Sequence, residues 1–152
     1  MSRIGFALCG SFCTHAAALT ALEALLACGH DIQPILSETA FSTDTRFGCA
    51  AALRERLESL CGRAVIHTVP EAEPLGPARP LDALVICPCT GNTLAKLANG
   101  VTDSAVTMAA KAHLRADRPL LVSLASNDAM SANLCNIGIL LPRKNVFFVP
   151  LR

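Results

Sequence analysis

The chain has 152 residues, of which 52% are hydrophobic and 16% are charged, and its formal net charge at pH 7 is +1. This length suits one domain with a buried core, so we expect residues 1–152 to form a single domain. A charge so near zero gives no electrostatic reason for binding nucleic acid or an acidic membrane. No apolar run approaches the roughly 18 residues of a membrane-spanning helix. The sparse charge instead favours burial of surface between subunits.

The predicted elements alternate between strands and helices along the chain. The N-terminal stretch MSRIGFALCG lacks a cleavage-site pattern, so it is interpreted as a first strand rather than a signal peptide. From periodicity and caps we predict strands over 4–9, 31–36, 65–66, 84–87, 119–124 and 146–149, and helices over 14–28, 50–61, 94–98, 105–114 and 131–141. This order favours a three-layer α/β/α sandwich with a mostly parallel, Rossmann-like (flavodoxin-like) sheet.

Prolines are predicted to interrupt this pattern in two places. Pro88 follows the apolar run 84–87 and should end that strand, because proline has no N–H for the ladder. The stretch 69–80, VPEAEPLGPARP, is expected to be a loop rather than a helix or a central strand. The hydroxyl-rich stretch 41–48, FSTDTRFG, is likewise predicted to be a loop.

The chain contains eight cysteines, but no two of them form a Cys-x-x-Cys pair. Because no compact second pair or nearby histidine pair completes a ligand set, we expect no zinc site. Most of the cysteines are interpreted as small buried apolar residues of a protein in the reducing cytoplasm.

Small polar residues follow every predicted strand that leads into a helix. The carboxyl ends of parallel strands meet at one edge of a sheet, where ligands bind and where helix N-termini favour a phosphate. For the stretch TGNT alone, helix capping by Thr90 or Asn92 would be the simpler interpretation. Four such ends together predict a binding crevice, with these candidate residues: Gly10, Ser11, Ser37, Thr39, Thr90, Gly91, Asn92, Thr93 and Ser126.

The ligand of this crevice is predicted to be a phosphorylated planar cofactor. Gly10 stands alone, so the Gly-x-Gly-x-x-Gly fingerprint of dinucleotide binding is absent. The sequence also lacks a Walker lysine and a Ser-His-Asp arrangement. FMN fits well, because its phosphate suits helix N-termini, its ring suits small neighbours, and the cofactor itself supplies the reactivity.

The stretch PCTGNT at 88–93 resembles the Pro-Ala-Ser-Ala-Asn-Thr motif of the homo-oligomeric flavin-containing cysteine decarboxylase family. The following KLANGVTDSAVTMAAKA is similar to that family's next helices. STDTRFG, EAEPLGP, SNDAM and KNVFFVP narrow the resemblance to the flavoprotein (B) subunits of bacterial dipicolinate synthases. The resemblance implies FMN, trimers or multiples of trimers, and a separate NAD(P)-dependent A subunit. Together these subunits would form pyridine-2,6-dicarboxylate during sporulation.

The chain departs from the decarboxylases at two places. Their histidine ahead of the central strand is missing from PLGPARPLD, and His67 is interpreted as a core or edge residue. Their Pro-x-Met-Asn substrate clamp is replaced by SNDAMSANLCN, where Asn133 and Asn136 are the nearest candidates. Catalytic residues therefore stay unassigned.

Three functions remain open at this stage. The first is a redox subunit whose FMN helps to oxidise a dihydropyridine dicarboxylate. The second is a non-catalytic scaffold that stabilises the dehydrogenase subunit. The third, which the missing histidine disfavours, is an FMN-dependent decarboxylase.

A dicarboxylate substrate calls for a cation near the crevice, and a guanidinium matches a carboxylate in two bonds. Arg46, in the hydroxyl-rich loop, is the candidate substrate-binding residue, with an ion pair to Asp44 as the alternative. Lys96 is interpreted as a solvated or interface residue, because its neighbours set the packing of the central helix.

Overall fold

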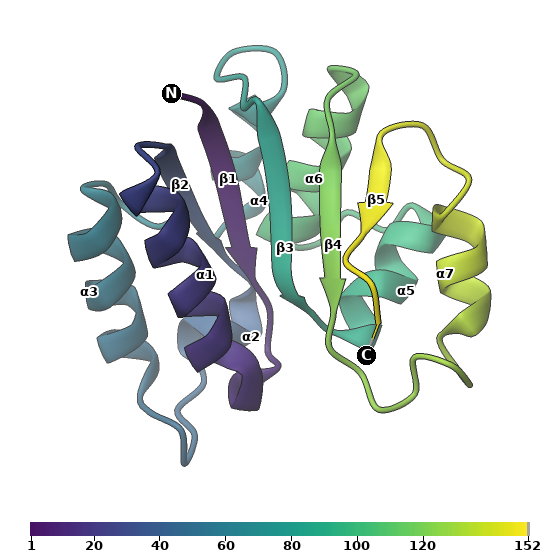
Figure 1. Cartoon of the computed structure of the whole chain (residues 1–152), viewed down its shortest axis with the longest axis horizontal. Helices are drawn as coiled ribbons and strands as arrows, with labels where there is room; N and C mark the ends of the chain where they lie inside the picture. The colour runs from purple at the N-terminus through teal and green to yellow at the C-terminus, as the bar shows by residue number, and fades with distance from the viewer. Residues whose placement is uncertain (152) are drawn as a thin grey trace.

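The computed structural model describes residues 1–151. In this part of the chain, five strands form one sheet at the centre of the molecule (Figure 1). Every pair of neighbouring strands within this part of the chain is parallel, and the order is β2-β1-β3-β4-β5. The strands are β1 (Arg3–Leu8), β2 (Asp31–Leu36), β3 (Ala83–Cys89), β4 (Leu120–Leu124) and β5 (Val146–Phe148). This topology confirms the predicted flavodoxin-like sheet.

Helices lie on both faces of the sheet and complete the three layers (Figure 1). On one side are α1 (His15–Ala27), α2 (Glu38–Ser42) and α3 (Ala50–Cys61). On the other are α4 (Val69–Ala72), α5 (Gly91–Asn99), α6 (Ala105–Arg115) and α7 (Leu134–Leu140). Two 3-10 turns, η1 (Phe12–Thr14) and η2 (Glu73–Leu75), precede α1 and follow α4. In residues 1–151, no helix is both long enough and apolar enough to cross a membrane.

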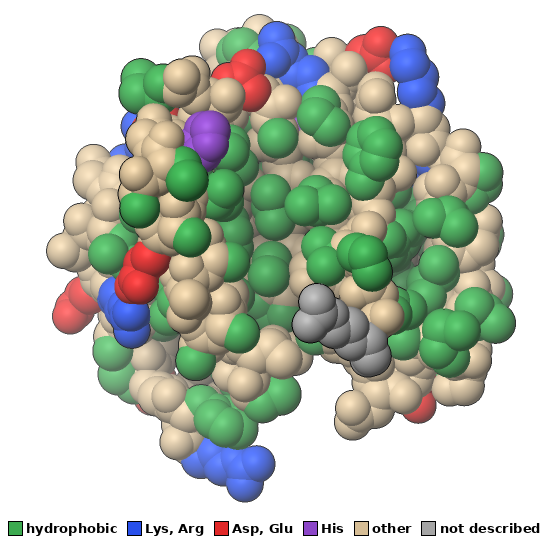
Figure 2. All heavy atoms as spheres, viewed as in Figure 1, with side chains coloured by type: hydrophobic (Ala, Val, Ile, Leu, Met, Phe, Trp, Pro, Cys, Tyr) green, Lys and Arg blue, Asp and Glu red, His purple; other side chains and the backbone are tan. Residues whose placement is uncertain are grey.

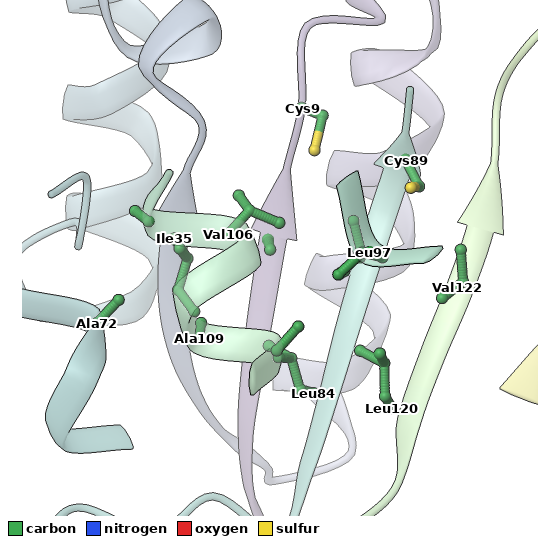
Figure 3. Packing of buried hydrophobic residues seen from close by; sticks show 14 of the residues in the cluster. Cys9, Ile35, Ala72, Leu84, Cys89, Leu97, Val106, Ala109, Leu120 and Val122 are labelled. Carbon is green, nitrogen blue, oxygen red and sulfur yellow. The ribbon is translucent and has the colours of Figure 1, made fainter. Parts of the chain in front are cut away.

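The sheet separates two hydrophobic clusters, because successive side chains of a strand point to opposite faces. Phe6 and Leu8 of β1 belong to the cluster under α1 and α3, whereas Ala7 belongs to the other. In that second cluster, Leu84 of β3 and Leu120 of β4 lie close to Ala109 of α6 (Figure 3).

In the part of the chain that the structure describes, residues 1–151, half of one face of the sheet carries no helix. α1 and α3 cover β1 and β2, whereas β4 and β5 have helices only on their other side (Figure 1). Apolar side chains gather over this open half (Figure 2). Phe147 of β5 is 55% exposed, and Leu121 of β4 is partly exposed.

The central strand does not end at Pro88, which corrects the first expectation about proline. β3 runs on to Cys89, and its register with β4 shifts between Ile86 and Cys89. At such an irregularity a proline removes no ladder hydrogen bond, so the strand tolerates it. The carbonyl of Pro88 accepts a hydrogen bond from the N–H of Cys9 at 3.1 Å, which joins β3 to the end of β1.

The proline-rich stretch 69–80 is partly helical, so the predicted loop is wrong there. Pro70 and Pro74 stand in the first turns of α4 and η2, where a missing N–H needs no partner. Thr68 and Glu71 form a capping box at the start of α4. These two prolines therefore mark helix starts rather than preventing helices.

Several boundaries differ from the predictions. α2 lies at the end of β2, partly within the predicted loop, and its N-cap is Ser37. The predicted strand at 65–66 is reduced to one bridge between Ile66 and Ile35. The helix predicted from residue 131 begins only at Leu134.

The cysteines are less buried than expected. Cys9 and Cys89 are buried, whereas four others are exposed because they lie at helix ends or on outer helix faces: Cys13, Cys28, Cys49 and Cys135. All eight are free thiols. Within residues 1–151, no group of three or more His, Cys, Asp or Glu side chains is arranged to hold a metal ion.

Candidate functional site

The strand order places a switch point between β1 and β3. The chain leaves β1 toward β2 on one side, and it leaves β3 toward β4 and β5 on the other. In doubly wound sheets of this order, the diverging loops leave a ligand crevice at the carboxyl ends of these two strands. The nine predicted cofactor-binding residues follow β1, β2, β3 and β4, so all of them lie along this one edge.

The ends of β1 and β3 are tied together by side chains. The hydroxyl of Thr93 donates to Sγ of Cys9 at 3.4 Å. Nε2 of His15 lies 2.7 Å from the carbonyl oxygen of Cys9, so that nitrogen carries the proton and donates. In Figure 3, Cys9 and Cys89 lie at the ends of β1 and β3. The first turns of α1 and α5 are thereby fixed on either side of the switch point.

The N-terminus of α5 is open toward this edge. Thr90 is the N-cap, and its hydroxyl oxygen accepts from the N–H of Thr93 at 3.2 Å. The helix begins at Gly91 rather than at Leu94, so Gly91 and Asn92 stand in the first turn, where amides have no intrahelical acceptor. Asn92 is exposed. The capping interpretation therefore holds for Thr90, while Asn92 stays available at the positive end of the helix dipole.

The loops after β1 and β2 lie in contact. A Cβ on Gly10 would come within 3.0 Å of Cγ2 of Thr39, so a larger residue would press the two loops apart. Ser37 Oγ accepts from the N–H of Ala40 at 3.2 Å. The hydroxyl of Thr14 donates to the carbonyl oxygen of Ser11 at 2.8 Å, with Ser11 Oγ as a second, longer acceptor at 3.2 Å. Both serines act as acceptors in these bonds, so each retains its own hydroxyl proton to donate to an anion.

The β4 side of the edge depends on Asn133, which the sequence connected only with the position of the decarboxylase clamp. Its Nδ2 donates to Ser126 Oγ at 3.2 Å, and its Oδ1 accepts from Asn136 at 3.3 Å. A Cβ on Gly91 would lie only 2.6 Å from that Nδ2. Asn133 thus packs on the first turn of α5 and joins it to the loop after β4.

The site is electrically neutral. Burial raises the pKa of the Cys9 thiol to about 11, against a smaller lowering by the hydrogen bond from Thr93. Burial also raises the pKa of Cys89 well above its ordinary value. Both are therefore thiols rather than nucleophilic thiolates at neutral pH. None of the nine residues titrates, so this edge offers hydroxyl and amide donors that fit a phosphate-bearing cofactor.

Arg46 is not part of this cluster. It lies in the exposed loop between α2 and α3, with its guanidinium over the ring of Phe47 at 4.9 Å. The alternative ion pair with Asp44 is not formed; that carboxylate instead accepts from the N–H of Ala50 at 2.8 Å. Phe47 and Cys13 line one hollow of about 310 Å³, so the Arg46 loop approaches the turn that follows Ser11.

Two other side chains lie outside the edge. His67 follows the edge bridge at Ile66, stacks on Phe41 with ring centres 3.7 Å apart, and faces Glu71 at 3.4 Å. His67 therefore lies beside the outermost strand, β2, as expected of a residue at the lateral side of the sheet. Lys96 is paired with Asp103 at 2.8 Å and lines a cavity between α5, α6 and α7.

Comparison with known proteins gives consistent relatives. A model of the flavoprotein family matches residues 1–142. The B subunit of dipicolinate synthase from Bacillus subtilis (strain 168) is 45% identical over 148 residues, which are 97% of this chain and 74% of that protein. The crystal structure of the dipicolinate synthase B subunit from Bacillus halodurans C superposes with a TM-score of 0.88 at 39% identity, covering 98% of this chain and 76% of that one.

A more distant structure is the FMN-dependent cysteine decarboxylase SpaF. Its TM-score is 0.74 at 25% identity, and the match covers 98% of this chain and 83% of that one. The order of similarity agrees with the sequence motifs, which point first to dipicolinate synthases and then to the decarboxylases. The chain belongs to the flavoprotein family, among the relatives of the dipicolinate synthase B subunit.

Proposed function

We propose that this chain is the FMN-binding B subunit of a dipicolinate synthase. It acts with a separate NAD(P)-dependent A subunit to form pyridine-2,6-dicarboxylate, in the reducing cytoplasm that eight free thiols suit. The observation that carries the proposal is the open N-terminus of α5 at the β1/β3 switch point, flanked by neutral donors from four loops. The 45% identity to a protein of that name supports the choice of reaction.

The residues of the site would have different roles around the cofactor. Ser11 and the first turn of α5 would receive the phosphate, because hydroxyls and free helix amides favour an anion. Gly10 and Gly91 keep the strand ends small, and Asn133 holds the β4 side against α5. Bound FMN would supply electron acceptance, which none of the nine side chains provides. The protein orients the ring and keeps Cys9 and Cys89 as unreactive thiols.

A visible absorption spectrum of the purified chain tests the proposal. We expect flavin bands that bleach when a dihydropyridine dicarboxylate and the A subunit are both supplied. Two results would contradict the redox role. One is flavin bands whose bleaching does not depend on the A subunit, and the other is a colourless protein that still raises the activity of the A subunit. The second result would instead support the scaffold.

We propose that Arg46 binds the dicarboxylate. Arg46→Ala should lower turnover with the A subunit about tenfold at limiting substrate, because an exposed charge-assisted contact lies near the lower end of about 1.5–3 kcal/mol. Flavin content should not change. The matched control is Arg79→Ala, which removes another exposed arginine outside this loop. Equal rates for the two variants would exclude a role of Arg46 in binding substrate.

We further propose that the chain forms homo-oligomers, with trimers or multiples of trimers as the expected state. Large apolar side chains are exposed at several places of the described surface: Phe47, Met130, Leu134, Leu141 and Phe147. A chain with so few charges gains by burying such side chains between subunits. The exposed Arg46 loop would then lie near a neighbouring protomer.

A further inference from the structure

A second cavity lies between α5, α6 and α7, outside the sheet edge described above. Its volume is about 440 Å³, within the size range of small-molecule sites. None of the nine cofactor-binding residues lines it. The cavity is therefore a separate feature, which the proposed flavin chemistry does not use.

The walls of this cavity are apolar. Leu97 of α5, Leu114 of α6 and Leu140 of α7 contribute side chains from three helices. Leu140 is buried, whereas Val101, in the loop after α5, is 40% exposed. A flat apolar ring bound in this cavity would contact side chains of all three helices.

Cations surround these apolar walls. Within residues 1–151, no aspartate or glutamate lines the cavity, whereas five lysines and arginines do: Lys96, Lys111, Arg115, Arg143 and Lys144. Lys96 is paired with Asp103 at 2.8 Å, and Lys144 with Asp117 at 2.7 Å. In a chain of net charge +1, such a cluster concentrates positive potential at one place.

Of the three lining cations that form no ion pair within residues 1–151, Arg143 donates to the carbonyl oxygen of Leu97 at 3.4 Å, and the other two, Lys111 and Arg115, are exposed. They lie four residues apart on α6, where like charges repel each other. No carboxylate of residues 1–151 lies within 4.0 Å of either one. Glu73 lines an adjacent hollow that both also border, but it forms no ion pair with them. The favourable end of the helix dipole accounts for Arg115 alone, not for a repelling pair beside an apolar cavity.

We propose that this cavity binds a small planar anion, an aromatic carboxylate, as a second ligand site. The ring packs on Leu97, Leu114 and Leu140, and the carboxylate lies between Lys111 and Arg115. Bound there, the carboxylate relieves the repulsion between the two cations. This arrangement uses both features of the cavity, which neither a neutral ring nor a small inorganic anion would do.

A ligand-observed NMR titration of the full chain as purified tests this site, with 2-naphthoate as the probe. The dissociation constant should be on the order of 1 mM, as expected for so few atoms. The neutral analogue 2-naphthalenemethanol should bind at least fivefold more weakly. The double substitution Lys111→Gln with Arg115→Gln should also weaken 2-naphthoate at least fivefold, whereas Arg79→Gln should not.

A second variant keeps the proposal falsifiable if the double variant folds poorly. Val101→Glu places a carboxylate at the exposed mouth without touching buried residues, and it should abolish 2-naphthoate binding. Equal binding of the charged and neutral probes, or unchanged binding by Val101→Glu, would overturn the proposal. Light scattering adds a further check: a change of oligomeric state in Val101→Glu would show that a neighbouring protomer, not a small anion, covers the cavity.

Discussion

Asn92→Trp should remove bound flavin while the fold stays intact. Asn92 is exposed in the first turn of α5, so a larger side chain costs the core nothing. It stands, however, where the free amides of Gly91 and Asn92 meet the β1/β3 switch point. An indole there would cover the helix N-terminus and obstruct a phosphate, so we expect flavin per protomer to fall at least tenfold.

The measurement should count flavin released by acid, because an indole beside a bound flavin would quench its fluorescence. Asn99→Trp is the matched control, since it makes the same change at the other end of α5. Both variants should keep the circular dichroism of the parent. Full flavin occupancy in Asn92→Trp would show that the cofactor does not use this helix N-terminus.

Gly76→Ala should lower the free energy of unfolding by about 3 kcal/mol, near the upper end of what overpacking costs. Gly76 is buried where the chain leaves η2 and passes α6. An added Cβ would lie 2.4 Å from the carbonyl oxygen of Ala112. The obstacle is helix backbone, which cannot rotate away as a side chain would, so α6 and η2 must separate.

Denaturant unfolding measures this loss, and Gly138→Ala provides the opposite control. Gly138 lies exposed in α7, and nothing stands within 4 Å of an added Cβ. That variant should gain up to about 1 kcal/mol from helix propensity. If both variants proved equally stable, the close approach of Gly76 to α6 would carry no energetic weight.

The sequence predicted the elements whose signals are local. Apolar runs identified the central strand, and the helix predicted over 50–61 matches α3, which Gly62 ends at φ 66°. The polar residues after each strand were correctly predicted to lie along one edge of the sheet, because parallel pairing brings all carboxyl ends together. Their role in holding flavin stays a prediction. The family resemblance was confirmed by the relatives.

What the sequence did not predict depends on contacts between distant segments. Pro70 and Pro74 look like helix breakers until their positions in first turns are known. Asn133 carries no signal of its own, since its role comes from packing on Gly91 across 42 residues of chain. The cations around the second cavity come from α5, α6 and the turn after α7, and no periodicity along one segment brings them together.

The open half of the sheet affects which strand we expect to separate from the sheet first. β5 has three residues and pairs only with β4; Val146 is its one buried side chain, and Phe147 lies largely in solvent. β1 lies between two strands, with Phe6 and Ala7 buried on opposite faces. We therefore expect local opening to begin at β5 rather than at β1 or β3. Ser126 follows β4, beside this outermost strand, whereas Ser11 follows β1. We therefore expect the two ends of the proposed cofactor site to differ in local stability.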